Sequence, residues 1–160
     1  MFYRVHLERV KERVKEPRKF IQVVLGPRQV GKTTMINQLL DDLSIPSIYE
    51  SADAISATNS TWLIQVWETA RLRMKAFDKN ELLLVIDEIQ KIDNWSEIVK
   101  QQWDRDTREN TNIKVILLGS SRLLIQKGLT ESLAGRFETI YLGHWSYDEM
   151  QKAFGWSIEQ

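Results

Sequence analysis

The sequence predicts an α/β three-layer sandwich, in which a mainly parallel sheet is covered by helices on both faces. Short apolar runs alternate along the chain with longer segments of helical periodicity. The runs 82–86 and 113–118 are almost continuously apolar, which is typical of strands buried on both faces. Between a third apolar run, 20–25, and the helical segment that follows it lies a loop with glycines at both ends, residues 26–31.

Length and composition indicate one globular domain, residues 1–160. Of its residues, 42% are hydrophobic and 28% are charged, and the formal net charge is zero. The chain has no cysteine, which excludes a disulfide framework and thiolate metal sites and suits a cytoplasmic protein. No apolar stretch approaches the roughly 20 residues that span a bilayer, so no membrane partner is expected.

The first expected helix, residues 5–15, is rich in basic side chains. Its apolar residues Leu7, Val10 and Val14 form a narrow stripe, which predicts that the helix docks on the domain. A partner or nucleic-acid contact of this basic segment is the alternative, and the zero net charge of the chain does not support it.

The other elements follow from periodicity and from apolar runs. The segments 60–77 and 94–108 place tryptophans at helical spacing, which indicates core residues, and Asp93 or Asn94 can cap the second segment. The expected strands are 20–25, 46–49, 82–87, 113–119 and 137–142, and the remaining expected helices are 32–42 and 146–154, with irregular helical turns at 121–134.

The loop from Gly26 to Thr33 fits G-x-x-x-x-G-K-[ST], the Walker A phosphate-binding pattern, at every fixed position. Glycines let successive N–H groups surround an anion, and the helix that follows adds its positive end. We expect Lys32 to reach the β- and γ-phosphates of a nucleotide and the Thr33 hydroxyl to bind Mg²⁺. The residues expected to bind the nucleotide are Gly26, Pro27, Arg28, Gln29, Val30, Gly31, Lys32, Thr33 and Thr34.

The apolar run 82–86 ends in Asp87 and Glu88, which is a Walker B pattern. Asp87 is expected to hold Mg²⁺, chiefly through water, because this ion dehydrates reluctantly. Glu88 is expected to orient and deprotonate the attacking water.

Two further candidates for the catalytic machinery follow the later strands. Ser120, with Ser121 as second choice, stands at the end of a strand where it could bind the γ-phosphate, although Gly-Ser-Ser is also ordinary turn chemistry. Arg136 could act as an arginine finger on a phosphate of this subunit or of an adjacent one, or it could satisfy carbonyls at a helix end.

With these motifs, the chain resembles the AAA+ ATPases, and more narrowly a prokaryotic group whose members carry an uncharacterised C-terminal domain. The matching segments are GPRQVGKTT, LLLVIDEIQK, ILLGSS and SLAGRFE, within about residues 18–150. The resemblance implies a five-stranded parallel sheet in which the strand before Ser120 lies between the Walker A and Walker B strands. It also implies ATP and Mg²⁺ as cofactors, Ser120 as a sensor residue and Arg136 as a finger supplied in trans by self-association.

AAA+ proteins follow this core with a helical lid, and the sequence ends at Gln160 without one. We therefore expect the chain to be a fragment, the ATPase core of a larger protein that hydrolyses ATP at the β–γ bond. The alternative is a nucleotide-gated binding module with negligible turnover of its own. A GTPase and a small-molecule kinase have weaker support, since the segment 90–93 resembles the guanine-binding motif only faintly and stands in the wrong place.

Overall fold

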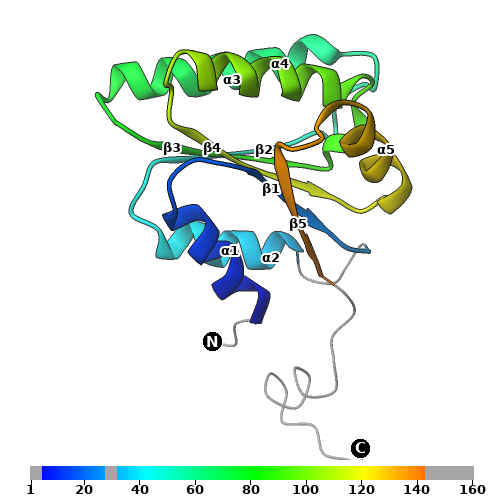
Figure 1. Ribbon diagram of the computed structural model, residues 1–160, viewed down its shortest axis with the longest axis horizontal. Coiled ribbons are helices and arrows are strands. Elements are labelled where there is room, and N and C mark those ends of the chain that lie inside the picture. The colour runs from blue at the N-terminus through cyan, green and yellow to red at the C-terminus, as the bar shows by residue number, and fades with distance from the viewer. Residues whose placement is uncertain (1–4, 28–31, 143–160) are drawn as a thin grey trace, which may run out of the picture.

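A parallel sheet forms the middle of the molecule, as the sequence predicts (Figure 1). The structure, a computed structural model, describes residues 5–27 and 32–142. The strands are β1 (Ile21–Leu25), β2 (Ser47–Ser51), β3 (Leu82–Asp87), β4 (Ile113–Gly119) and β5 (Phe137–Tyr141). They form a five-stranded sheet in the order β2-β3-β4-β1-β5, and every neighbouring pair is parallel. The predicted position of β4 between β1 and β3 is therefore confirmed.

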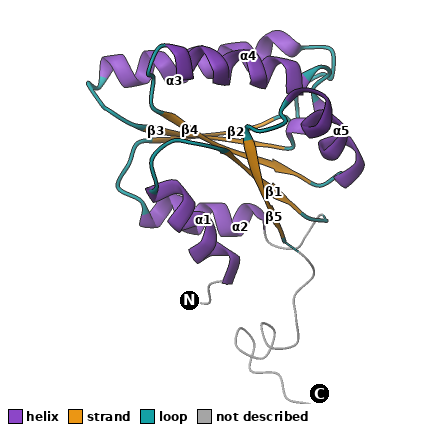
Figure 2. Ribbon diagram, viewed as in Figure 1, coloured by secondary structure: helices purple, strands orange, loops and turns teal. Residues whose placement is uncertain are grey.

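Helices cover both faces of this sheet and complete the three layers (Figure 2). Two helices pack below it in the view of Figure 1, and the other three pack on the opposite face. The first group is α1 (Val5–Lys15) and α2 (Lys32–Asp42); the second is α3 (Ser60–Ala76), α4 (Trp95–Arg108) and α5 (Arg122–Ser132).

The central strands β1, β3 and β4 are buried along their whole length, as their continuous apolar character predicts. Successive side chains of a strand point to opposite faces, so each strand feeds two cores. Ile86, for example, packs in the core under α3 and α4, whereas Val85 packs in the core over α1 and α2.

The basic helix α1 docks on the domain through its predicted stripe. Leu7 and Val10 are fully buried, and Val14 is 3% exposed. Among the described residues, no helix combines the length and the apolar character needed to cross a membrane.

Several expected boundaries need correction. The turns expected at 121–134 form a regular helix, α5, and β2 runs on to Ser51, two residues beyond the predicted strand. Asn94 does stand before α4, but its backbone is left-handed (φ 56°) and its side chain makes no capping hydrogen bond. The helix expected at 146–154 lies outside the described residues.

Candidate functional site

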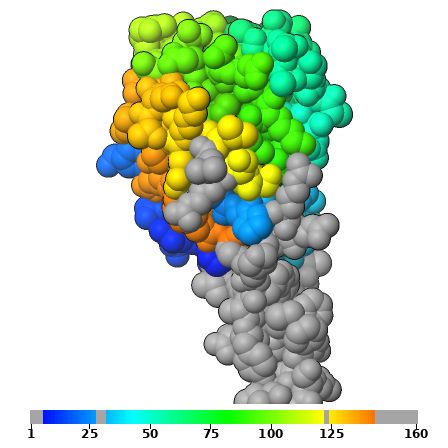
Figure 3. All heavy atoms as spheres, turned by 90° about the vertical axis from the view of Figure 1, so that its right-hand side faces the viewer, coloured from blue at the N-terminus to red at the C-terminus, as the bar shows by residue number. Residues whose placement is uncertain are grey.

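The candidate site lies where the parallel strands end. Because all strands run in one direction, their carboxyl ends share one edge of the sheet, which is where α/β proteins bind ligands. Pro27 follows β1, Glu88 follows β3 and Ser120 follows β4 at this edge. In Figure 3 the residues beside the phosphate loop (light blue) and those after β4 (yellow) reach the surface next to each other.

Lys32 begins α2 and is 7% exposed. Its ammonium nitrogen donates to the carbonyl oxygen of Gly26 at 2.6 Å and to that of Pro27 at 2.9 Å. The lysine thus lies against the start of the glycine-containing loop that follows β1. Of the other predicted loop residues, Thr33 and Thr34 are exposed in the first turn of α2, and Arg28, Gln29, Val30 and Gly31 lie outside the described residues.

Gly26 has a steric reason to be glycine. A Cβ atom at this position would lie 2.2 Å from the carbonyl oxygen of Leu142, which is backbone and cannot move aside cheaply. The close approach joins the exit of β1 to the end of β5, where the amide of Leu142 donates to the carbonyl of Leu25 at 2.7 Å.

Asp87, the last residue of β3, is 7% exposed and meets the start of α2. Its Oδ2 accepts a hydrogen bond from the Thr33 hydroxyl at 3.3 Å, and its Oδ1 accepts one from the amide of Glu88 at 2.9 Å. The two residues predicted to bind Mg²⁺, 54 positions apart in the chain, therefore lie side by side.

The Tyr49 hydroxyl also donates to Asp87 Oδ2, at 2.5 Å. Tyr49 lies on β2, which pairs in parallel with β3. Burial, supported by this hydrogen bond, raises the pKa of the Tyr49 phenol. The hydroxyl therefore keeps its proton and remains a donor to the carboxylate throughout the neutral pH range.

Glu88 is 8% exposed and stands in the left-handed region, at φ 54° and ψ 40°. This conformation is uncommon for a residue with a side chain and is found preferentially at functional sites. The Ser120 hydroxyl donates to Glu88 Oε2 at 2.9 Å, and the Gln90 side-chain amide donates to the same oxygen at 2.7 Å. The predicted catalytic base and the predicted γ-phosphate contact are thus in direct contact.

Arg136 lies at the opposite side of the sheet, where the parallel strands begin. It immediately precedes β5, and its carbonyl accepts a hydrogen bond from the amide of Ile21, the first residue of β1. Its guanidinium donates to both carboxylate oxygens of Asp104, at 2.8 and 3.0 Å, and these bonds lower the pKa of the Asp104 carboxyl. The guanidinium of Arg136 is thus paired with Asp104, and its action on a nucleotide of its own subunit or of an adjacent one stays a prediction.

Two residues of the site, Tyr49 and Gln90, were not predicted. Tyr49 lies within an expected strand, but the strand order that places it beside Asp87 cannot be predicted from the hydrophobic pattern of that segment. Gln90 follows Asp87 and Glu88 closely, and its contact with Glu88 depends on the left-handed turn at Glu88. A polar residue just beyond an Asp-Glu pair was the available signal.

Comparison with known proteins agrees with this geometry. Residues 18–151 match the family described as AAA domain. An uncharacterised protein of Methanocaldococcus jannaschii is 25% identical over 142 residues, covering 78% of this chain and 26% of that protein. The chain spans about a quarter of that relative's length. Because the family match covers most of its residues, the chain belongs to the AAA domain family, whose members are P-loop ATPases.

Proposed function

We propose that the chain binds ATP with Mg²⁺ and hydrolyses it at the β–γ bond, as the ATPase core of a larger AAA-type protein. The observation that carries the proposal is the contact of Thr33 with Asp87, 3.3 Å apart, next to Lys32 at the start of α2. P-loop enzymes hold Mg²⁺ and phosphates with a hydroxyl and an ammonium group at the start of a helix and with a carboxylate at the end of a neighbouring strand.

The donor set suits Mg²⁺. Within residues 5–27 and 32–142, no group of three or more His, Cys, Asp and Glu side chains could enclose a metal ion. Mg²⁺ does not need such a cage, because it keeps several waters and takes one or two protein oxygens together with phosphate oxygens. The Thr33 hydroxyl would supply such an oxygen, Asp87 would hold the ion chiefly through its water, and the bound ion would neutralise charge on the phosphates.

For the reaction we assign the proton transfer to Glu88. The oxygen of a water molecule attacks the γ-phosphorus, the bond to the β–γ bridging oxygen breaks, and the Glu88 carboxylate takes the proton from the water. Ser120 would contact the γ-phosphate and Lys32 would balance its charge. The contact between Ser120 and Glu88, 2.9 Å, supports this division of roles because it puts both groups at one point.

Replacing Lys32 by alanine tests the nucleotide site. We expect Lys32→Ala to weaken ATP affinity about 10- to 100-fold, since it removes charge-assisted hydrogen bonds to phosphate. Titration with a fluorescent ATP analogue measures the change. Lys127→Ala, at an exposed lysine of α5, is the matched control and should leave the affinity unchanged. Equal affinities of the Lys32→Ala variant and the unaltered chain would remove the phosphate-loop assignment.

The second candidate function is a nucleotide-gated binding module that turns over negligibly by itself. The match covers only 26% of the archaeal relative, and the turnover of a core within a longer protein can depend on the rest of that protein, which favours this candidate. Single-turnover cleavage of ATP at high protein concentration distinguishes the two functions. We expect cleavage, and we expect Arg136→Ala to slow it by up to about 10³-fold if self-association brings Arg136 to a neighbouring phosphate. An unchanged rate in Arg136→Ala would restrict this arginine to its pair with Asp104.

A further inference from the structure

Gln90 makes contacts that the roles assigned above do not use. It lies in the 3₁₀ turn Ile89–Lys91 that follows β3 and Glu88. Its side-chain nitrogen donates to Glu88 Oε2 at 2.7 Å and lies 3.4 Å from the Ser120 hydroxyl oxygen. Its side-chain oxygen is buried and has no hydrogen-bond partner within the described part of the chain. Native structures rarely leave such an atom unpaired, so the position of the Gln90 side chain requires an explanation.

The local backbone conformation brings the side-chain amide of Gln90 next to the carboxylate of Glu88. The left-handed conformation of Glu88 turns the chain sharply, and the amide of Lys91 then donates to the Glu88 carbonyl at 3.1 Å. A Cβ atom on Gly119, at the end of β4, would lie 2.7 Å from the Ile125 side chain and 2.9 Å from the Gln90 side-chain oxygen, so glycine leaves room for both side chains. Gln90 is therefore held against the carboxylate by its turn and by the neighbouring strand.

Both donors reach the same oxygen of Glu88. Ser120 and Gln90 bind Oε2, and no hydrogen bond from residues 5–27 or 32–142 reaches Oε1. Such an arrangement fixes the plane of the carboxylate while leaving one oxygen available to a water molecule. A general base must be held within hydrogen-bond reach of the proton that it takes, so this restraint bears directly on the reaction.

We propose that Gln90 is a positioning residue that holds the Glu88 carboxylate when the γ-phosphate engages Ser120. The inference rests on the proposed hydrolysis, in which Ser120 turns its hydroxyl to the nucleotide. At that moment Ser120 no longer restrains Glu88, and the hydrogen bond from Gln90 keeps Oε2 in place while Oε1 accepts the proton. A residue that only filled space beside Gly119 would be replaceable by any side chain of the same length.

Gln90→Met separates these roles, because methionine has the length of glutamine but no N–H group. We expect kcat to fall between about tenfold and 10²-fold, the range that a misplaced catalytic group produces, with KM for ATP changed less than about twofold. Gln101→Met, at an exposed glutamine of α4, is the control for the substitution itself and should match the unaltered chain. An unchanged kcat in Gln90→Met, or an equal loss in Gln101→Met, would overturn the proposal.

A measurement without turnover tests the hydrogen bond itself. The side-chain ¹⁵N–¹H signals of Gln90 are assigned by their loss in Gln90→Met. They should shift in Glu88→Gln, where the accepting carboxylate is gone, and on addition of a non-hydrolysable ATP analogue but not of ADP. Unchanged chemical shifts of the Gln90 side-chain signals in Glu88→Gln would overturn the proposal. A chain that cleaves no ATP would overturn the proposed hydrolysis instead, and the inference about Gln90 would then be decided by these signals alone.

Discussion

Glu88→Gln is expected to bind ATP with Mg²⁺ like the unaltered chain and to cleave it about 10²–10⁴ times more slowly, the range that a positioned general base contributes. Glutamine keeps the length and shape of the side chain, so the site should remain assembled around Ser120. Its amide cannot accept the proton of the attacking water. Single-turnover cleavage measures the rate, and equilibrium titration with the same nucleotide measures the affinity.

The matched control for this variant is Glu131→Gln on α5, which makes the same chemical change at an exposed position. Its cleavage rate should equal that of the unaltered chain. Normal turnover in Glu88→Gln would take the base role away from Glu88. A simultaneous loss of binding would instead show that the substitution disturbs the loop that holds the phosphates.

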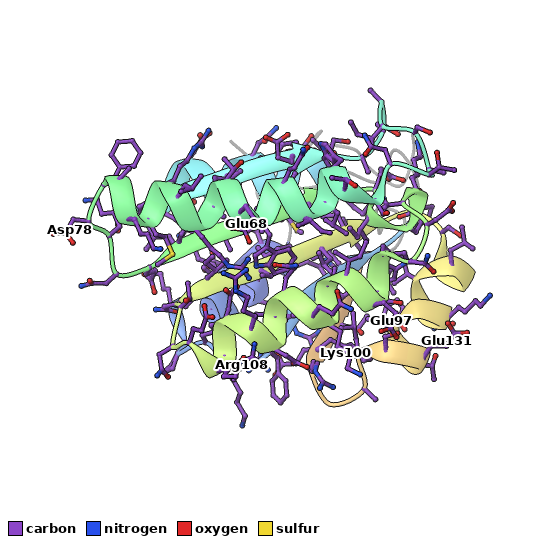
Figure 4. All side chains as sticks on the ribbon, turned by 90° about the horizontal axis from the view of Figure 1, so that it is seen from above. Glu68, Asp78, Glu97, Lys100, Arg108 and Glu131 are labelled. Atoms are coloured by element: carbon purple, nitrogen blue, oxygen red, sulfur yellow. The ribbon has the colours of Figure 1, made fainter. Side chains whose placement is uncertain are left out.

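Asp106→Ala is expected to lower the free energy of unfolding by about 3–5 kcal/mol, the cost of removing one partner from a buried ion pair. Asp106 lies on α4 and is fully buried where this helix packs against α3. Figure 4 shows α3 and α4 side by side as the two green helices. Its carboxylate accepts hydrogen bonds from the Trp67 indole and from the Arg71 guanidinium, both at 2.8 Å. Alanine would leave a buried indole N–H and part of a buried guanidinium unpaired. Urea denaturation measures the change.

Asp104→Ala provides the comparison on the same helix. Asp104 pairs with Arg136 near the surface, with 38% of its side chain exposed, so its loss should lower the free energy of unfolding by at most about 1 kcal/mol. If both substitutions lowered the free energy of unfolding by the same amount, burial of the Asp106 hydrogen bonds would add little to the stability of the protein. The Asp106 variant should also keep its nucleotide affinity once folded, because the network lies away from the phosphate loop.

The elements and the centre of the site follow from the sequence because their signals are local. Continuous apolar runs identify buried strands such as Leu82–Asp87, and a parallel sheet then requires their carboxyl ends to share an edge. Thr33 and Asp87 come together for that reason. The order of the strands followed from the resemblance to the AAA+ ATPases, not from periodicity.

The contacts that were missed depend on strand order or on unusual backbone. Tyr49 reaches Asp87 only because β2 pairs with β3, and nothing in the run 46–49 specifies its neighbour. Gln90 reaches Glu88 only because Glu88 adopts a left-handed conformation, which no propensity predicts for glutamate. Trp67 and Asp106 lie 39 residues apart on two different helices, and tryptophan spacing alone predicts burial but not a polar partner.

The opposite placement of Lys32 and Arg136 limits the symmetry of any assembly that uses both. A contact with two-fold symmetry pairs identical surfaces of the two subunits. If it buries only the carboxyl ends of the strands, it brings two phosphate loops together, and if it buries only their amino ends, it brings two copies of Arg136 together. Delivery of Arg136 to a neighbour's nucleotide requires subunits that stack head to tail or lie side by side in opposite directions. A head-to-tail stack repeats until it closes into a ring or continues as a filament.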